Sequence, residues 1–103
     1  MGKRIVWTRP SVEDLRELRQ YIAQDSPENA SNFIRRIRIE VAHIATHPQL
    51  GRVVPESEDP QIREIFVANY RVIYRAASRV EILRVQRMSR QLSTQDLDEP
   101  PPF

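Results

Sequence analysis

Cysteine is absent from this chain of 103 residues, and long apolar runs are absent as well. Without cysteine there is no disulfide, no thiolate metal ligand and no cysteine nucleophile. No apolar run approaches the roughly 20 residues that span a bilayer, and nothing near Met1 resembles the apolar region of a signal peptide. We therefore expect a cytoplasmic protein, and the length is that of one domain.

Lysine is also scarce, since Lys3 is the only lysine among 16 basic residues. Codon bias in a GC-rich genome explains this as well as function does. Guanidinium groups, however, suit flat or bidentate anionic partners better than ammonium groups do. Between Pro60 and Leu92 seven arginines stand against two acids, although the net charge of the chain is only +2. This concentration of positive charge indicates binding to a nucleic acid or to an acidic protein surface.

Apolar residues recur at helical spacing in two neighbouring segments, and three strand-like segments follow them. Thr8 or Ser11 can cap the first helix. Ser26-Pro-Glu separates the helices with an N-cap, and so short a link makes them an antiparallel hairpin. The sequence therefore predicts an α+β fold, βααβββ, in which a helical hairpin packs on a small twisted antiparallel sheet. We expect a strand at 4–8, helices at 8–25 and 26–47, a loop at 48–60, and strands at 61–67, 70–75 and 80–87.

Two short segments carry their own expectations. Ala68-Asn69 reads as a two-residue hairpin turn, with Asn69 in the left-handed conformation that asparagine tolerates. Residues 93–103 are acidic and rich in proline, so we expect a disordered tail after a folded domain that spans residues 1–92.

Both faces of the predicted sheet carry apolar residues. A sheet covered by helices on one face is normally polar on the other, so we expect a partner protein to cover the second face. In the central strand Tyr70, Val72 and Tyr74 face one way and Arg71, Ile73 and Arg75 the other; in the last strand Val80 and Ile82 face one way and Leu83 and Val85 the other.

The residues give little support for catalysis or metal binding. Cleavage of RNA through its 2′-hydroxyl needs a base, but arginine stays protonated, and the tyrosines are weak bases. His43 and His47 lie on the second predicted helix, away from the arginine-rich strands. With Glu40 they share one helix edge at a spacing that could hold zinc, but no fourth ligand is evident. We therefore predict no catalytic residue, no metal and no cofactor.

Several segments, in this order, resemble the ParE/RelE superfamily of bacterial type II toxins. The resemblance runs from about Ile5 to Leu92. The segments that carry it are Val12–Ile22, His47–Arg52, Ile62-Arg-Glu-Ile65, Asn69–Arg75 and Ile82–Val85.

The superfamily has two branches with different chemistry. RelE-like members are ribosome-dependent ribonucleases, whereas ParE-like members bind and poison DNA gyrase. The two lysines of the ribonucleases fall on Ile62 and Glu64 here, and their final tyrosine falls near Ser93, so the resemblance favours the ParE branch. It implies that a ParD-like antitoxin neutralises the protein. It also implies that the toxin does not associate with a membrane and that the toxin alone does not bind nucleic acid sequence-specifically. Arg87 stands where many ParE-like chains have histidine, which leaves open a degenerate, non-toxic relative.

The resemblance also suggests two sets of contact residues. The arginines near the end of the sheet are expected to bind the target, and residues of the first two C-terminal strands are expected to bind the antitoxin. The target set is Arg71, Arg84, Arg87 and Arg90; the antitoxin set is Arg63, Tyr70, Ile73 and Tyr74.

Overall fold

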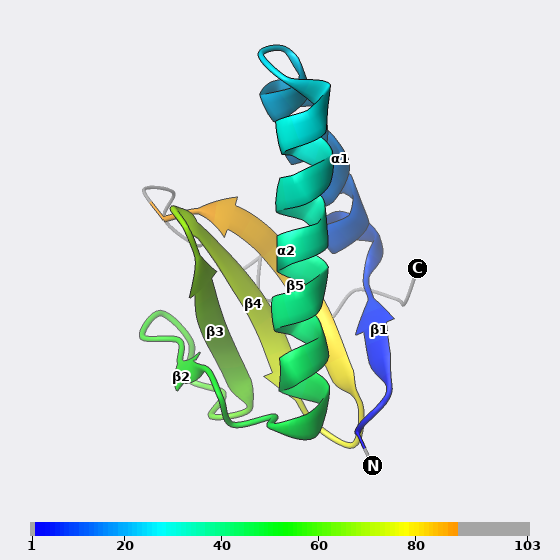
Figure 1. Cartoon of the computed structure of the whole chain (residues 1–103). Helices are drawn as coiled ribbons and strands as arrows, with labels where there is room; N and C mark the ends of the chain where they lie inside the picture. The colour runs from blue at the N-terminus through cyan, green and yellow to red at the C-terminus, as the bar shows by residue number, and fades with distance from the viewer. Residues whose placement is uncertain (1, 89–103) are drawn as a thin grey trace.

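The computed structural model describes residues 2–88, in which two helices pack against a five-stranded sheet (Figure 1). Arg90 and the predicted tail at 93–103 lie outside the described residues. Within the described part no helix is long and apolar enough to span a bilayer. The elements are β1 (Ile5–Trp7), α1 (Arg9–Ala23), α2 (Pro27–Thr46), β2 (Arg52–Val53), β3 (Ile62–Val67), β4 (Tyr70–Ala76) and β5 (Val80–Arg87).

Both helices begin at the predicted caps. The Thr8 hydroxyl accepts a hydrogen bond from the backbone of Ser11 at 3.4 Å, and the Ser26 hydroxyl accepts one from Asn29 at 3.1 Å. Thr8 also donates to the carbonyl oxygen of Ile82 at 2.7 Å. The cap of α1 is therefore tied directly to β5, which fixes α1 beside the last strand.

The sheet has the order β1-β5-β4-β3-β2, and two of its strands differ from the prediction. The pairs β2–β3, β3–β4 and β4–β5 are antiparallel, but β1 pairs parallel to β5. The prediction of a wholly antiparallel sheet was therefore wrong at this edge. A parallel partner needs a long connection, and the rest of the chain supplies it. β2 falls in the predicted loop at 48–60, where Arg52 pairs with Glu64 and Val53 with Arg63.

An irregularity between β4 and β5 changes which residues share a face. The register shifts between Ile73 and Tyr74, so that Ile73 pairs with Arg84 and Tyr74 with Ile82. The extra residue, Leu83, resets the alternation of β5. Val85 consequently joins the main core beneath the helices, which corrects the prediction that it faces the same way as Leu83.

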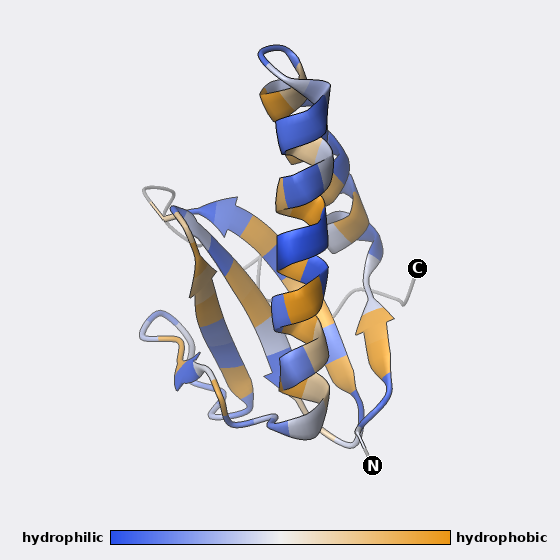
Figure 2. Cartoon of the chain, in the orientation of Figure 1, coloured by the Kyte–Doolittle hydropathy of each residue, from blue (hydrophilic) through white to orange (hydrophobic). Residues whose placement is uncertain are grey.

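The face that carries the helices holds the main core, and the opposite face holds a smaller one. α2 runs across the first face (Figure 2), and its buried residues Ile37, Val41 and Ile44 belong to the main core. We call the opposite face the arginine face. Its apolar cluster is Ile62, Ile73 and Leu83, covered by Val54 from the chain's own loop rather than by a partner. The arginine face comprises Ile62, Glu64, Phe66, Arg71, Ile73, Arg75, Glu81, Leu83 and Gln86.

The β3–β4 turn has the predicted length but another residue takes the left-handed conformation. Ala68 has a φ of 53°, and among the described non-glycine residues it alone has a positive φ, so the assignment to Asn69 was wrong. The carbonyl of Asn69 accepts a hydrogen bond from Met88 at 3.0 Å. That bond holds Asn69 beside the end of β5, so Ala68 is the residue at which the chain reverses direction.

Candidate functional site

Arg71 lies at the centre of the arginine face and is 7% exposed. Its two terminal nitrogens donate to the carboxylate of Glu56 at 3.0 and 3.2 Å, and one of them also pairs with Glu64. Burial lowers the pKa of Arg71, but its hydrogen bond with Glu56 and the charges of both acids outweigh that effect and raise it. Arg71, predicted to contact a target, is therefore engaged within the chain.

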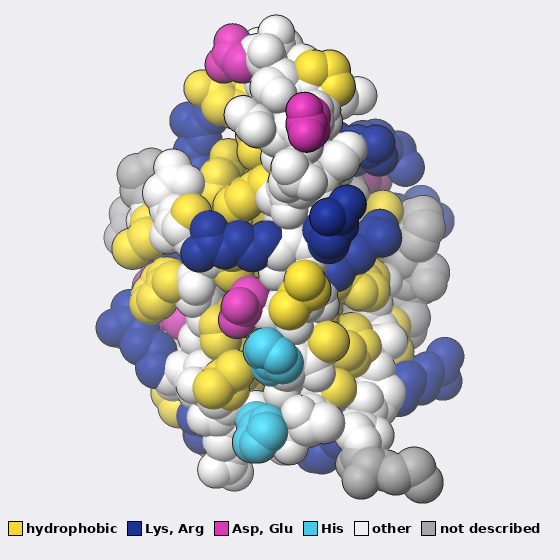
Figure 3. Space-filling model, in the orientation of Figure 1, with side chains coloured by type: hydrophobic (Ala, Val, Ile, Leu, Met, Phe, Trp, Pro, Cys, Tyr) yellow, Lys and Arg dark blue, Asp and Glu magenta, His cyan; other side chains and the backbone are white. Residues whose placement is uncertain are grey.

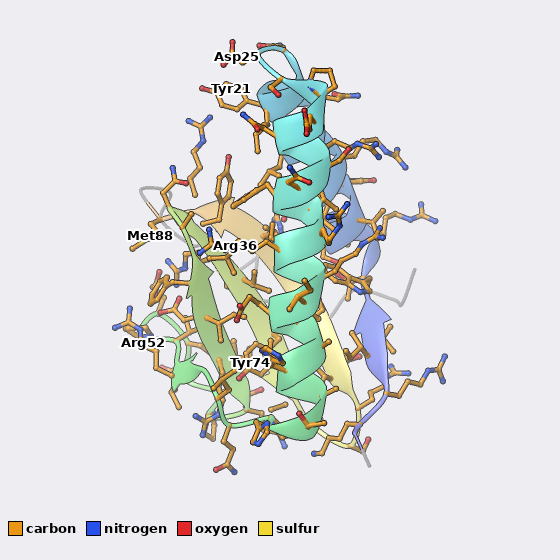
Figure 4. All side chains as sticks on the ribbon, viewed as in Figure 1. Tyr21, Asp25, Arg36, Arg52, Tyr74 and Met88 are labelled. Atoms are coloured by element: carbon orange, nitrogen blue, oxygen red, sulfur yellow. The ribbon has the colours of Figure 1, made fainter. Side chains whose placement is uncertain are left out.

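Glu64 connects Arg71 to a second arginine. Its side chain is fully buried, and one oxygen accepts a hydrogen bond from Arg52 Nε at 2.6 Å while the other pairs with Arg71. The guanidinium of Arg52 also lies 5.2 Å from the ring centre of Phe66, which is 45% exposed. Figure 4 shows Arg52 beside β2, at the outer edge of the sheet.

A second ion-pair group lies further along the same face. Arg75 pairs with Asp59 from the loop and with the buried Glu81, and Arg79 pairs with Glu81 at 3.0 Å. A backbone hydrogen bond from Gln61 is the largest cause of a lowered pKa at Asp59, burial opposes it, and Arg75 adds to the lowering. Acids of the loop thus form ion pairs with arginines that the sequence alone suggested would bind external partners.

Three residues of the predicted antitoxin set support the loop after α2 or the core. Tyr74 is fully buried; its hydroxyl donates to Pro48 O at 2.8 Å and accepts from Gly51 N at 2.9 Å, and burial raises its pKa. Arg63 donates to Gly51 O at 2.8 Å. Ile73 is fully buried in the smaller core. Neither Tyr74 nor Ile73 offers surface to a partner in this conformation.

Gly51 is required for this arrangement. A Cβ at this position would lie 2.8 Å from the backbone carbon of Glu64 and 2.9 Å from the hydroxyl of Tyr74. The loop can approach β3 so closely only because glycine has no side chain.

Arg84 is held by a residue that the sequence did not suggest. Asp14 of α1 accepts hydrogen bonds from two nitrogens of Arg84, at 2.8 and 2.9 Å, and from the backbone of Val85 at 2.9 Å. β1 pairs with β5 only as far as Ile82, so beyond that point Asp14 accepts the hydrogen bond that the backbone of Val85 would otherwise donate to a neighbouring strand. The two residues are 70 positions apart, so no local pattern could have revealed the contact.

Arg87 differs from the other described target residues, because it is exposed at the end of the sheet. Its guanidinium lies 4.7 Å from the ring centre of Tyr21, which is 57% exposed near the α1–α2 turn (Figure 4). Hydrogen bonds with Tyr70 and then Tyr21 raise its pKa. Tyr70 itself is 8% exposed, and its ring is tilted by 55° to that of Phe33 with the ring centres 5.6 Å apart.

A cleft of about 290 Å³ lies between α1 and β5 at this end. It combines a guanidinium with two phenol rings and two carboxylates, so it can hold a mixed polar and aromatic surface of a partner. Its lining residues are Asp14, Glu17, Leu18, Tyr21, Tyr70, Val85, Gln86 and Arg87. The structure thus brings Arg87 and Tyr70 together, with Arg84 held by Asp14 at the rim, and leaves Arg71 on the arginine face.

The histidines lie away from both regions. His43 lies on the solvent side of α2 and His47 is the C-cap of that helix (cyan in Figure 3), on the face of the molecule opposite the arginine face. Glu40 Oε2 and His43 Nδ1 are 3.9 Å apart and largely exposed. Within residues 2–88 no group of three or more histidine, aspartate or glutamate side chains is arranged to hold a metal ion.

Comparison with known proteins identifies the fold and the family. Residues 5–92 match the family described as the ParE toxin of the type II toxin–antitoxin system parDE. The chain is 34% identical to the toxin candidate Y4kP of Sinorhizobium fredii, over 86% of this chain and 92% of that protein. It is 32% identical to the toxin RelE2 of Caulobacter vibrioides, over 84% and 96%.

Two solved structures have the same fold. A chain of the chromosomal ParDE system from P. aeruginosa aligns with a TM-score of 0.68 and 24% identity, covering 84% of this chain and 96% of that one. A chain of the RelBE2 toxin–antitoxin complex from Mycobacterium tuberculosis aligns with a TM-score of 0.59 and 19% identity, covering 84% and 99%.

The arrangement of two helices on a five-stranded sheet is therefore that of ParE/RelE-type toxins. The family match extends over nearly all of the described residues, and the two curated relatives are named as a toxin candidate and as a RelE toxin. The chain belongs to the ParE family of type II toxin–antitoxin toxins.

Proposed function

We propose that this toxin acts in the cytoplasm by binding and inhibiting DNA gyrase, without a catalytic centre, and that a cognate ParD-like antitoxin neutralises it. The match of residues 5–92 to the ParE toxin family carries the proposal. The related P. aeruginosa chain belongs to a ParDE toxin–antitoxin system, which supports an antitoxin of the ParD type as the partner.

Arg87 is the leading residue for the target contact. Arg71 and Arg84 are held by Glu56, Glu64 and Asp14, so they act by shaping the sheet and its edge. Arg87 instead presents its guanidinium at an open cleft, where it is supported by the ring of Tyr21. Arg90 remains part of the proposed contact by its nearness in sequence. Arg63 and the exposed edge of the Tyr70 side chain remain the proposed antitoxin contacts.

A binding mechanism fits the chemistry of the described residues better than hydrolysis does. A general base must be unprotonated near neutral pH so that it can accept a proton. The pKa of Tyr74 is raised by burial, and the arginines remain protonated. The histidines lie on α2 and at its C-terminal end, away from the cleft and the arginine face.

The second candidate is a ribosome-dependent messenger RNA endonuclease. The 32% identity to a toxin named RelE2 favours it. In that case Arg87 would stabilise the charge on the scissile phosphate, and one of the cleft tyrosines would have to act in proton transfer.

Expression of the chain without an antitoxin separates the two candidates. Gyrase inhibition predicts induction of the DNA-damage response and filamentous cells, whereas messenger cleavage predicts a rapid loss of protein synthesis with little DNA damage. Arg87→Glu should abolish the growth arrest. The matched control is Arg35→Glu, which makes the same charge change at an exposed position of α2 and should remain toxic. Growth arrest that persists in Arg87→Glu would place the contact elsewhere.

A further inference from the structure

The loop that follows β2 lies over the arginine face and is anchored there. Val54 is fully buried against Ile62, Ile73 and Leu83, and its backbone N–H donates to Ile62 O at 3.1 Å. Beyond Val54 the loop is held by its own turn, in which Ser57 N donates to Val54 O at 3.1 Å. At the other end of the loop, Ile62 N donates to Asp59 O at 3.1 Å. The loop is therefore attached at its start and closed by a turn at its end, and the acidic part between them lies over the arginines.

Two kinds of acid pair with these arginines. Glu64 and Glu81 belong to the sheet, and their side chains are 0% and 3% exposed. Glu56 and Asp59 belong to the loop, and their side chains are 30% and 36% exposed. The sheet acids are fixed parts of the fold. The loop acids reach the same guanidinium groups from outside, where another carboxylate could replace them.

The balance of charge on this face depends on the loop. Four arginines, at positions 52, 71, 75 and 79, pair with four carboxylates, at positions 56, 59, 64 and 81. With the loop in place the group is neutral. If Glu56 and Asp59 moved away, the group would carry two positive charges over a low-dielectric surface, where an anionic partner is attracted most strongly.

Hydrogen-bonding capacity also remains unused beside Arg71. Both amide atoms of Gln86, which is 3% exposed, and the Nε of Arg71 have no hydrogen-bond partner in the described part of the chain. Gln86 pairs with Arg71 across β4 and β5, so the two side chains are neighbours on the arginine face. Buried polar groups are normally satisfied. A free amide donor and acceptor next to a guanidinium would suit a peptide group and a carboxylate.

We propose that the arginine face is a binding site for an acidic peptide segment, and that the loop residues Val54–Asp59 occupy this site in the free protein as an internal competitor. The bound segment would place two carboxylates three residues apart on Arg71 and Arg75, as Glu56 and Asp59 are now. A peptide fits better than a phosphate group, because a peptide places its two charges separately on Arg71 and Arg75, whereas a phosphate concentrates its charge beside one of the buried acids, Glu64 or Glu81. This proposal does not depend on whether gyrase is the target of the toxin.

Binding of a synthetic peptide to the purified chain tests this proposal. The probe has the sequence of residues 54–60, and its control is a peptide of the same composition in scrambled order. Glu56→Ala removes a loop acid that covers the site, whereas Glu58→Ala removes an exposed acid of the same loop for which no contact with Arg71 or Arg75 is seen. Because a site that is closed most of the time binds in proportion to its open fraction, opening it should raise the affinity.

Calorimetry should show that Glu56→Ala binds the probe at least tenfold more tightly than wild type or Glu58→Ala, and more tightly than it binds the scrambled peptide. Equal binding by Glu56→Ala and Glu58→Ala would overturn the proposal. Tighter binding of inorganic pyrophosphate than of the probe would overturn the assignment to a peptide. If Glu56→Ala does not fold, the side-chain Nε resonance of Arg71 in wild type should shift as the probe is added, and an unchanged resonance would refute the site.

Discussion

Glu64→Gln tests the role of the buried carboxylate that joins two arginines of the sheet. Glutamine has nearly the same shape, so the change removes the negative charge without creating a cavity. One side-chain oxygen would remain for either Arg52 or Arg71, but not for both with full charge. The effect should therefore report the ion pairs rather than packing.

The magnitude follows from the exposure of the two partners. The side chain of Arg52 is 61% exposed, so solvent screens its pair and its share is about 0–1 kcal/mol. The side chain of Arg71 is 9% exposed, and loss of one partner from a buried pair costs about 3–5 kcal/mol. Because Glu56 would still neutralise part of that charge, we expect a loss of about 2–3 kcal/mol in the free energy of unfolding.

Urea denaturation measures this loss directly. The midpoint should fall while the slope with denaturant stays constant, and the melting temperature should drop by roughly 10–20 °C. Glu58→Gln, the same change at an exposed position of the loop, should stay within about 0.5 kcal/mol of wild type. A loss below about 1 kcal/mol for Glu64→Gln would show that the buried network does not hold the sheet as argued.

Three further changes probe other parts of the fold. Tyr74→Phe removes the hydroxyl bonded to Pro48 and Gly51 and should cost about 1–3 kcal/mol by urea denaturation, whereas Tyr21→Phe, at an exposed ring, should cost little; equal effects would contradict the account. Ala68→Gly relieves a positive φ and should raise the melting temperature by a few degrees, and a decrease would mean that the turn is not strained. The pKa of Asp59 in the folded chain is lowered from its ordinary 3.8, so the stability that Asp59 contributes is complete above that pH and is lost as the pH falls through the folded pKa. In an acid titration, Asp59→Asn should therefore lose less stability than wild type below about pH 4. An equal loss of stability in both proteins would be contrary evidence.

The helix starts and the succession of the main elements along the chain could be predicted from the sequence because their signals are local. Thr8 and Ser26 cap the helices as expected, since a cap depends on residues only three positions away. The parallel pairing of β1, the short β2 and the bulge at Leu83 depend on contacts between distant segments. Alternation along β5 could not reveal that Val85 returns to the core, because one extra residue reverses the pattern.

The candidate site was predicted only in part, and for a related reason. The composition correctly showed that arginines gather in the C-terminal strands. It could not show that Glu56, Asp59 and Asp14 would pair with Arg71, Arg75 and Arg84, because these acids lie 15 to 70 positions away in the sequence. The partner of Arg87, Tyr21, is similarly distant, and its ring fits a helical pattern that gives no sign of a contact with β5. Exposure, rather than the number of arginines, distinguishes Arg87.

Gyrase assays with purified protein test the central claim most directly. The wild-type chain should inhibit supercoiling and accumulate cleaved DNA, the Arg87→Glu variant should do neither at equal concentration, and Arg35→Glu should behave as wild type. Normal supercoiling in the presence of the folded wild-type chain, or full inhibition by Arg87→Glu, would contradict the account.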